Sequence, residues 1–114
     1  MRRAARRGKY NARKTTVDNI VFASKREAAR YVELKLLQRA KRIADLECQP
    51  QFPIVVNGQT VAKYVADFQY RELAWDFEIV ENLVVEDVKG MKTPVYRLKK
   101  NLVEAQYGIQ IREV

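Results

Sequence analysis

The chain has 114 residues and a formal net charge of +8, which is enough for one domain with a hydrophobic core but too short for two. It contains no histidine and one cysteine, which excludes Ser-His-Asp and Cys-His catalysis, imidazole-ligated zinc centres and an intrachain disulfide. No stretch approaches the roughly 18 to 20 apolar residues of a membrane span, and no apolar signal core follows the basic N-terminus, so we expect a cytoplasmic protein without membrane contact.

The positive charge is concentrated toward the N-terminus. Residues 1–42 hold 14 Lys and Arg against 3 Asp and Glu, whereas residues 43–114 hold 8 against 11. Residues 1–14 have no acid, which predicts a disordered basic arm ahead of a single domain over 15–114. The asymmetry favours a nucleic-acid partner, because Lys and Arg neutralise phosphates and release counterions; a solubilising tail is the alternative. The arm residues expected to contact DNA are Arg2, Arg3, Arg6, Arg7, Arg13 and Lys14.

A first helix is predicted from Ser24 to about Arg42. Ser24 is followed three residues later by Glu27, which is the spacing of a capping box. Steps of about 100° per residue place one set of apolar side chains on a common arc, which we expect to face the core. The members of this arc are Ala28, Ala29, Val32, Leu36, Ala40 and Ile43.

A hairpin follows, because Asn57-Gly58 is a strong signal for a two-residue turn. It predicts a strand at 54–56 before the turn and a second strand from Thr60 to about Arg71, with Asp67 in its latter half. Residues 72–82 fit either an extension of this strand or a long connection.

The last part of the chain predicts a strand, a helix and a strand. Residues 83–89 are rich in β-branched apolar residues, as in a buried central strand. Thr93-Pro94 opens a second helix that runs to about Gln106 and ends at Gly108, and residues 109–114 alternate as in a last strand. We therefore expect an α/β fold with a mixed sheet of about four strands flanked by helices, in the order α-β-β-β-α-β.

Charged residues in apolar strands are the candidate chemistry. Asp87 and Lys89 are two residues apart and share a face of their strand, whereas Glu86 points to the other face. Burial of such charges costs several kcal/mol unless they are paired or bound to a metal, and Asp67 lies in a similar apolar context on an adjacent predicted strand. Two carboxylates and a lysine suit Mg²⁺-dependent phosphodiester hydrolysis, with the lysine as a fixed positive charge. An exposed Asp87–Lys89 ion pair, with Asp67 marking a turn, is the alternative.

The order of these features resembles the PD-(D/E)XK nuclease superfamily, in particular its small phage-encoded members, some of them grouped with Holliday-junction resolvases. The resemblance covers roughly residues 10–114. It rests on Asp67 in Val65-Ala66-Asp67-Phe68, on the triplet Asp87-Val88-Lys89, and on Glu27 in the capped helix. Ala66 stands where the superfamily has proline.

The resemblance implies a DNA endonuclease in which Glu27, Asp67 and Asp87 hold Mg²⁺, with Mn²⁺ as a substitute, and Lys89 stabilises charge. Glu27 also has a capping task, and Glu33 is its competitor as the helical ligand. Action on branched DNA would require a twofold homodimer. The alternatives are a non-catalytic nucleic-acid-binding protein of phage recombination or packaging, and an RNA-binding protein. No small-molecule cofactor is expected. Further DNA contacts are expected from Arg26, Arg30, Lys92, Arg97, Lys99 and Lys100.

Overall fold

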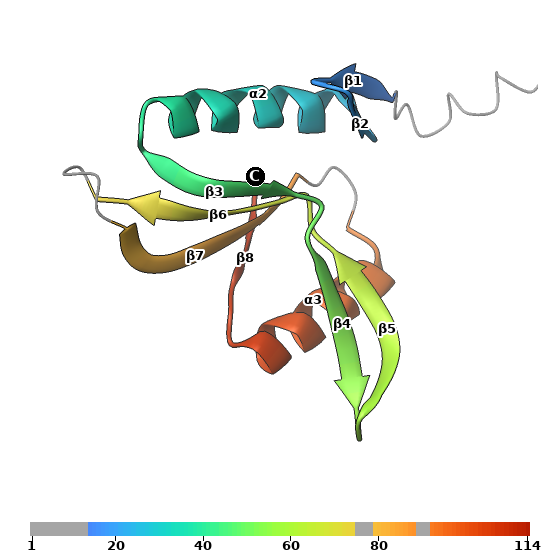
Figure 1. The fold of residues 1–114 in the computed structure, drawn as a ribbon. Coiled ribbons are helices and arrows are strands. Elements are labelled where there is room, and N and C mark those ends of the chain that lie inside the picture. The colour runs from blue at the N-terminus through green and yellow to red at the C-terminus, as the bar shows by residue number, and fades with distance from the viewer. Residues whose placement is uncertain (1–13, 75–78, 89–91) are drawn as a thin grey trace, which may run out of the picture.

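The computed structural model describes residues 14–74, 79–88 and 92–114, and these residues form two helices, a four-stranded sheet and two short hairpins (Figure 1). No helix in these ranges is long and apolar enough to cross a membrane. The elements in chain order are β1 (Thr15–Val17), β2 (Ile20–Phe22), α2 (Lys25–Arg39), β3 (Ile43–Cys48), β4 (Gln51–Val56), β5 (Gln59–Val65), β6 (Phe68–Leu73), β7 (Ile79–Asp87), α3 (Pro94–Tyr107) and β8 (Ile111–Glu113).

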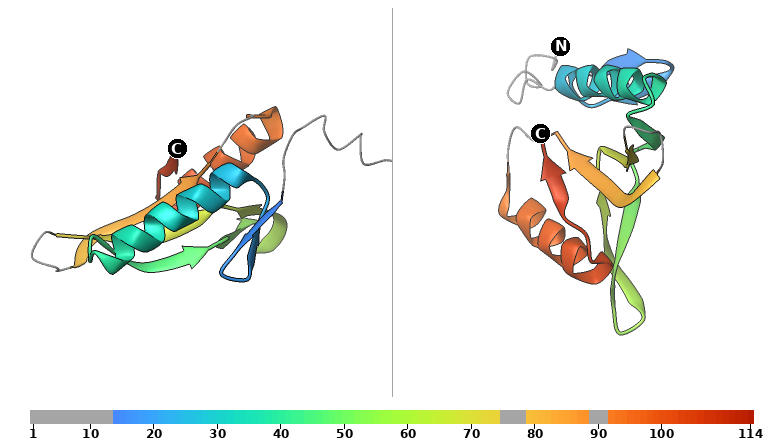
Figure 2. Two further views of the ribbon diagram at one scale, coloured as in Figure 1. Left: turned by 90° about the horizontal axis from the view of Figure 1, so that it is seen from above. Right: turned by 90° about the vertical axis from the view of Figure 1, so that its left-hand side faces the viewer.

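The main sheet has the strand order β3-β6-β7-β8. β6 pairs antiparallel with both β3 and β7, whereas β8 is parallel to β7. Figure 2 shows β7 and β8 side by side, with their C-terminal ends pointing toward α2. The expected α/β fold with a mixed sheet and flanking helices is confirmed. The order α-β-β-β-α-β also holds for α2, the four sheet strands and α3, although two of these strands differ from those predicted.

Helix α2 begins as predicted but ends earlier and buries another face. The Ser24 hydroxyl accepts a hydrogen bond from the Glu27 N–H (3.2 Å), whereas the helix ends at Arg39 and Lys41 takes a positive φ of 63°. The expected arc was wrong: Val32 and Leu36 are 43% and 58% exposed. Of the predicted arc α2 buries only Ala28, and its other two buried residues are Tyr31 and Leu34. The sequence carries apolar residues on two adjacent arcs, and the hydrogen bond from the Tyr31 hydroxyl to Asp18 (2.8 Å) anchors the second one.

The Asn57-Gly58 hairpin is confirmed. Both residues have positive φ (50° and 78°), as a two-residue turn of this kind requires, and they join β4 to β5. The predicted single strand over 60–71 was wrong, because the chain leaves the hairpin at Ala66-Asp67 and enters the main sheet as β6. The hairpin is therefore a separate two-stranded sheet that projects from the body of the molecule (Figure 1).

One strand pair and one further strand lie where no strand was expected. β1 and β2 form a small hairpin around Asp18-Asn19, both with positive φ, and it packs against α2. β3 occupies residues that were predicted to end or follow the helix, so Ile43 is buried in the sheet rather than on α2.

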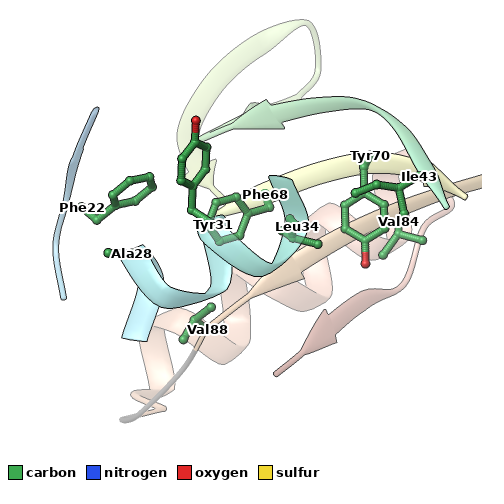
Figure 3. Packing of buried hydrophobic residues seen from close by; sticks show 9 residues of the cluster. All are labelled: Phe22, Ala28, Tyr31, Leu34, Ile43, Phe68, Tyr70, Val84 and Val88. Atoms are coloured by element: carbon green, nitrogen blue, oxygen red, sulfur yellow. The ribbon is translucent and has the colours of Figure 1, made fainter. Parts of the chain in front are cut away.

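Each face of the sheet carries its own core. Toward α2 lie the side chains shown in Figure 3, which are Phe22, Ala28, Tyr31, Leu34, Ile43, Phe68, Tyr70, Val84 and Val88. Toward α3 and the β4–β5 hairpin lie Phe52, Ile54, Tyr64, Ala66, Val85, Val103 and Ile111. β7 supplies residues to both cores by alternation, which is why its sequence is apolar on both sides.

Helix α3 has the predicted ends. The Thr93 hydroxyl accepts from the Tyr96 N–H (3.1 Å), Pro94 stands in the first turn, and Gly108 ends the helix in the left-handed conformation. β8 is shorter than predicted and covers Ile111–Glu113. Because β8 is parallel to β7, its C-terminal residues reach the same edge of the sheet as Asp87.

Candidate active site

Two aspartates lie together where β6 begins and β7 ends: Asp87 is the last residue of β7, and Asp67 lies in the bend just before β6. The backbone N–H of Asp67 donates to the backbone oxygen of Glu86 (3.1 Å) and to Oδ1 of Asp87 (3.2 Å). Oδ2 of Asp67 accepts from the N–H of Val88 (2.7 Å). Asp67 is half-buried and Asp87 is fully buried. The structure thus brings together the two carboxylates that the sequence predicted. Lys89 lies outside the described residues.

Glu86 points to the opposite face of β7, as the pleat predicts. Its fully buried carboxylate accepts two hydrogen bonds from Arg30, Nε to Oε1 at 2.9 Å and Nη2 to Oε2 at 2.6 Å, and a third from the Tyr70 hydroxyl. Hydrogen bonding to Glu86 raises the pKa of Arg30, and burial together with the same carboxylate raises the pKa of Tyr70. Arg30, expected at the DNA surface, therefore has an intramolecular role in joining α2 to β7.

Glu27 lies at the end of α2 nearest the aspartates. Ala28 shares a core cluster with Val88, and the Arg26 guanidinium donates to the backbone oxygen of Val114, the residue after β8 (3.3 Å). Glu27 is half-buried and within 3.5 Å of the Ser24 hydroxyl, so it takes part in the helix cap as well. Its competitor Glu33 has a side chain that is 65% exposed and is paired with Arg30. Among the described residues, however, Glu27 does not join the two aspartates in a group of three acids placed to hold one ion.

Glu113 is a further acid at this edge that the sequence did not single out. It is the register partner of Asp87 in the parallel β7–β8 pair, so both side chains lie on the α3 face. Its carboxylate accepts from the Tyr96 hydroxyl (2.7 Å) and pairs with Lys92 (2.9 Å) and Lys100 (3.6 Å). Hydrogen bonds from Tyr96 and Lys92 lower the pKa of Glu113 to about 2. The available signal was an acid two residues after the buried Ile111, as Asp87 is after Val85.

Three of the predicted DNA-contacting cations surround one hollow of about 280 Å³ next to Glu113. They are Lys92, Arg97 and Lys100, and Asn101 completes the lining with Glu113. Lys99 points elsewhere, donating to the backbone oxygen of Lys63 (3.4 Å). Lys14 is exposed near the start of the described chain. The other arm residues predicted to contact DNA, namely Arg2, Arg3, Arg6, Arg7 and Arg13, lie outside the described residues.

A protein-family model matches nearly the whole chain. The model describes a protein of unknown function, DUF1064, and it matches residues 7–113. The chain belongs to the DUF1064 family. No curated protein and no solved structure matches the chain. The DUF1064 match covers both aspartates, Glu113 and the cations of the hollow, and it includes Arg7, Arg13 and Lys14 of the basic arm but not Arg2, Arg3 and Arg6.

The paired aspartates of this DUF1064 chain suit a hard divalent cation. Mg²⁺ is commonly held by one or two carboxylates together with water and substrate phosphate oxygens. Two carboxylates side by side repel each other, and burial of Asp87 raises that cost unless a positive charge compensates it. Across the described ranges, no group of three or more Asp, Glu or Cys side chains is placed to hold one ion. The donor set is therefore a pair of aspartates, with Glu27 at the same end of the sheet.

Proposed function

We propose that this DUF1064 chain is a metal-dependent DNA endonuclease of the PD-(D/E)XK type that hydrolyses phosphodiester bonds. The observation that carries the proposal is the juxtaposition of Asp67, in the bend before β6, and Asp87, at the end of β7, which are joined by the hydrogen bond between the Asp67 N–H and Asp87 Oδ1. An acid pair at the edge of a mixed sheet, beside a capped helix with a glutamate, is the arrangement that the sequence resemblance implies.

In this proposal Asp67 and Asp87 hold Mg²⁺, or Mn²⁺ in its place, and Glu27 is the third acid at the same end of the sheet. The cation would supply an activated water and would neutralise charge on the phosphate. The chain fixes the acids beforehand: Val88 N–H orients Asp67, and Asp67 N–H orients Asp87. Lys89, assigned from the sequence alone, would stabilise the developing negative charge.

DNA is the proposed substrate because positive charge surrounds this edge of the sheet. Lys92, Arg97 and Lys100 surround the hollow next to Glu113, whose neighbour in β7 is Asp87. The basic arm adds sequence-independent attraction to the phosphate backbone. The histidine-free composition agrees with a mechanism that uses carboxylates, a lysine and a hard cation.

The test compares the purified full-length chain with its Asp67→Asn and Asp87→Asn variants on duplex, single-stranded and four-way-junction DNA, with Mg²⁺ and with EDTA. We expect cleavage only with Mg²⁺, and a loss of at least about 100-fold in each variant, which corresponds to about 2.7 kcal/mol of transition-state stabilisation. Asp45→Asn is the matched control. Its side chain is 68% exposed on β3, and its positive φ of 57° suits asparagine as well as aspartate.

Three outcomes would contradict the proposal. Cleavage that survives both variants would remove the aspartates from the mechanism. A mobility shift without cleavage in the wild type would instead support the non-catalytic nucleic-acid-binding alternative. Preferential retention of RNA at matched salt would indicate an RNA-binding protein. Paired cuts on a four-way junction would further require a homodimer, which light scattering during gel filtration would detect.

A further inference from the structure

The hollow next to Glu113 is built from two segments of the chain. Lys92 precedes α3, whereas Arg97, Lys100 and Asn101 lie on one face of α3 at the i, i+3 and i+4 spacing. Glu113 enters from the end of β8. Three cations and an amide donor thus face a single carboxylate, and the lining of the hollow keeps a net positive charge.

The carboxylate of Glu113 organises the two lysines. Oε1 lies 2.9 Å from Lys92 Nζ, and Oε2 lies 3.6 Å from Lys100 Nζ and accepts from the Tyr96 hydroxyl at 2.7 Å. An ammonium group has three donors, so Lys92 keeps two after pairing with Glu113, and Lys100, which also lies 4.0 Å from Glu104 Oε2, keeps at least one. Within the described residues Arg97 has no ion pair, and its five guanidinium donors suit a phosphate.

The position of the hollow relates it to the aspartate pair. Glu113 and Asp87 are register partners on parallel strands, and Tyr96 of α3 donates its hydroxyl hydrogen bond to Glu113. The hollow and the aspartates therefore lie on the same face of the sheet and at the same edge. A polyanion held by the cations would pass close to Asp87.

We propose that this hollow is a subsite for one backbone phosphate of DNA, a phosphate near the one that is cleaved. Lys100 and Arg97 bind its non-bridging oxygens from α3, Lys92 binds from the preceding segment, and Glu113 keeps the two ammonium groups oriented. The inference rests on the proposed nuclease function for the identity of the ligand as DNA. It assigns the hollow a part in holding the substrate, with no part in the chemical step.

The experiment measures equilibrium binding of the full chain to a labelled duplex in EDTA, where no cleavage occurs, over a range of KCl concentrations. Arg97→Gln and Lys100→Gln should each weaken binding roughly tenfold, because a hydrogen bond to a charged group is worth about 1.5 kcal/mol or more. Each should also make the negative slope of log affinity against log salt concentration shallower by about 0.9, because one phosphate contact is lost. Lys41→Gln, the same change at an exposed site beyond the C-terminal end of α2, is the matched control.

A second arm locates the phosphate. A neutral methylphosphonate is placed at one position of the duplex at a time, and one position should weaken wild-type binding but leave Lys100→Gln binding unchanged. Lys100→Arg should retain the wild-type salt slope, and thermal unfolding of every variant separates loss of contact from loss of fold. The inference is overturned if Arg97→Gln and Lys100→Gln match Lys41→Gln, or if every methylphosphonate weakens the wild type and Lys100→Gln alike.

The two proposals can fail separately. A chain that binds DNA with the predicted salt slopes but never cleaves it would refute the endonuclease and leave the phosphate subsite in place. Mg²⁺-dependent cleavage with slopes that Arg97→Gln and Lys100→Gln do not change would refute the subsite alone.

Discussion

Removal of Arg30 should destabilise the protein through the buried carboxylate that it leaves behind. Glu86 is fully buried, and Arg30 gives it two of its three hydrogen bonds, at 2.9 and 2.6 Å. The Arg30→Met variant keeps an unbranched side chain along the helix but leaves Glu86 with the Tyr70 hydroxyl. Breaking a buried ion pair from one side costs about 3 to 5 kcal/mol. The Arg30 side chain is 24% exposed, so water can reach the vacated space, and we expect about 3 kcal/mol.

A cost of that size would lower the midpoint of thermal unfolding by roughly 10 to 20 °C for a domain of this size. Urea denaturation followed by circular dichroism gives the free energy of unfolding directly. The double variant Arg30→Met with Glu86→Leu should recover most of the loss, because an apolar pair of similar volume often replaces a buried ion pair without net cost. The two single changes should therefore be strongly non-additive.

Arg71→Met is the control for loss of an arginine alone. Arg71 lies 3.9 Å from Asp45, and the two side chains are 41% and 68% exposed, so the change should cost less than about 1 kcal/mol. The reasoning is refuted if Arg30→Met is as stable as Arg71→Met, or if the double variant loses the sum of the single losses.

Three further outcomes follow from single residues. The pKa of Glu113 is lowered to about 2, so its contribution to stability is complete above its ordinary pKa of 4.5 and is lost as pH falls toward 2. Glu113→Gln should therefore reduce the loss of stability between pH 4.5 and 2, measured by urea denaturation. Equal pH dependence of the variant and the wild type in this window would contradict it. Gly108→Ala should lower the free energy of unfolding by about 1 kcal/mol, because an alanine is strained at a φ of 66°. The added methyl group meets no atom within 4 Å, so no steric clash adds to this cost, and a much larger loss would contradict the prediction. Burial raises the pKa of the Cys48 thiol, so iodoacetamide should alkylate it more slowly at pH 8 than it alkylates a small free thiol, as mass spectrometry would show; equal rates would rule this out.

Local chemistry made the ends of elements predictable. Ser24, Thr93 and Gly108 cap their helices, and Asn57-Gly58 forms its turn, because each of these residue types satisfies a backbone requirement within a few residues. β3 could not be predicted in the same way. Lys41 and Asp45 both have positive φ where the chain turns and bends, and neither residue type predicts this conformation in the sequence. Ile43, between them, fits a helical arc as well as a strand.

Long-range partners explain the rest of the difference. In the sequence Arg30 cannot be distinguished from the other basic residues of α2, because its partner Glu86 lies 56 residues later in the chain. The same holds for the helix face, because the choice between two apolar arcs depends on where Tyr31 meets Asp18. Asp67 and Asp87 could be singled out from the sequence because each is an acid between apolar neighbours, a pattern that stands out whether or not the strand boundaries are known. Glu113 carried the same signal in a three-residue strand, where the pattern is too short to read.

Glu86 and Asp87 are consecutive residues whose side chains make contacts on opposite faces of the sheet. Glu86 holds α2 on one face through Arg30, while Asp87 meets Asp67 on the other. A change of backbone position at either residue also moves its neighbour, so substitutions at this dipeptide are constrained by contacts on both faces of the sheet. Substitutions intended to raise thermal stability are accordingly better placed on the outer surface of α2, where Val32 and Leu36 are exposed.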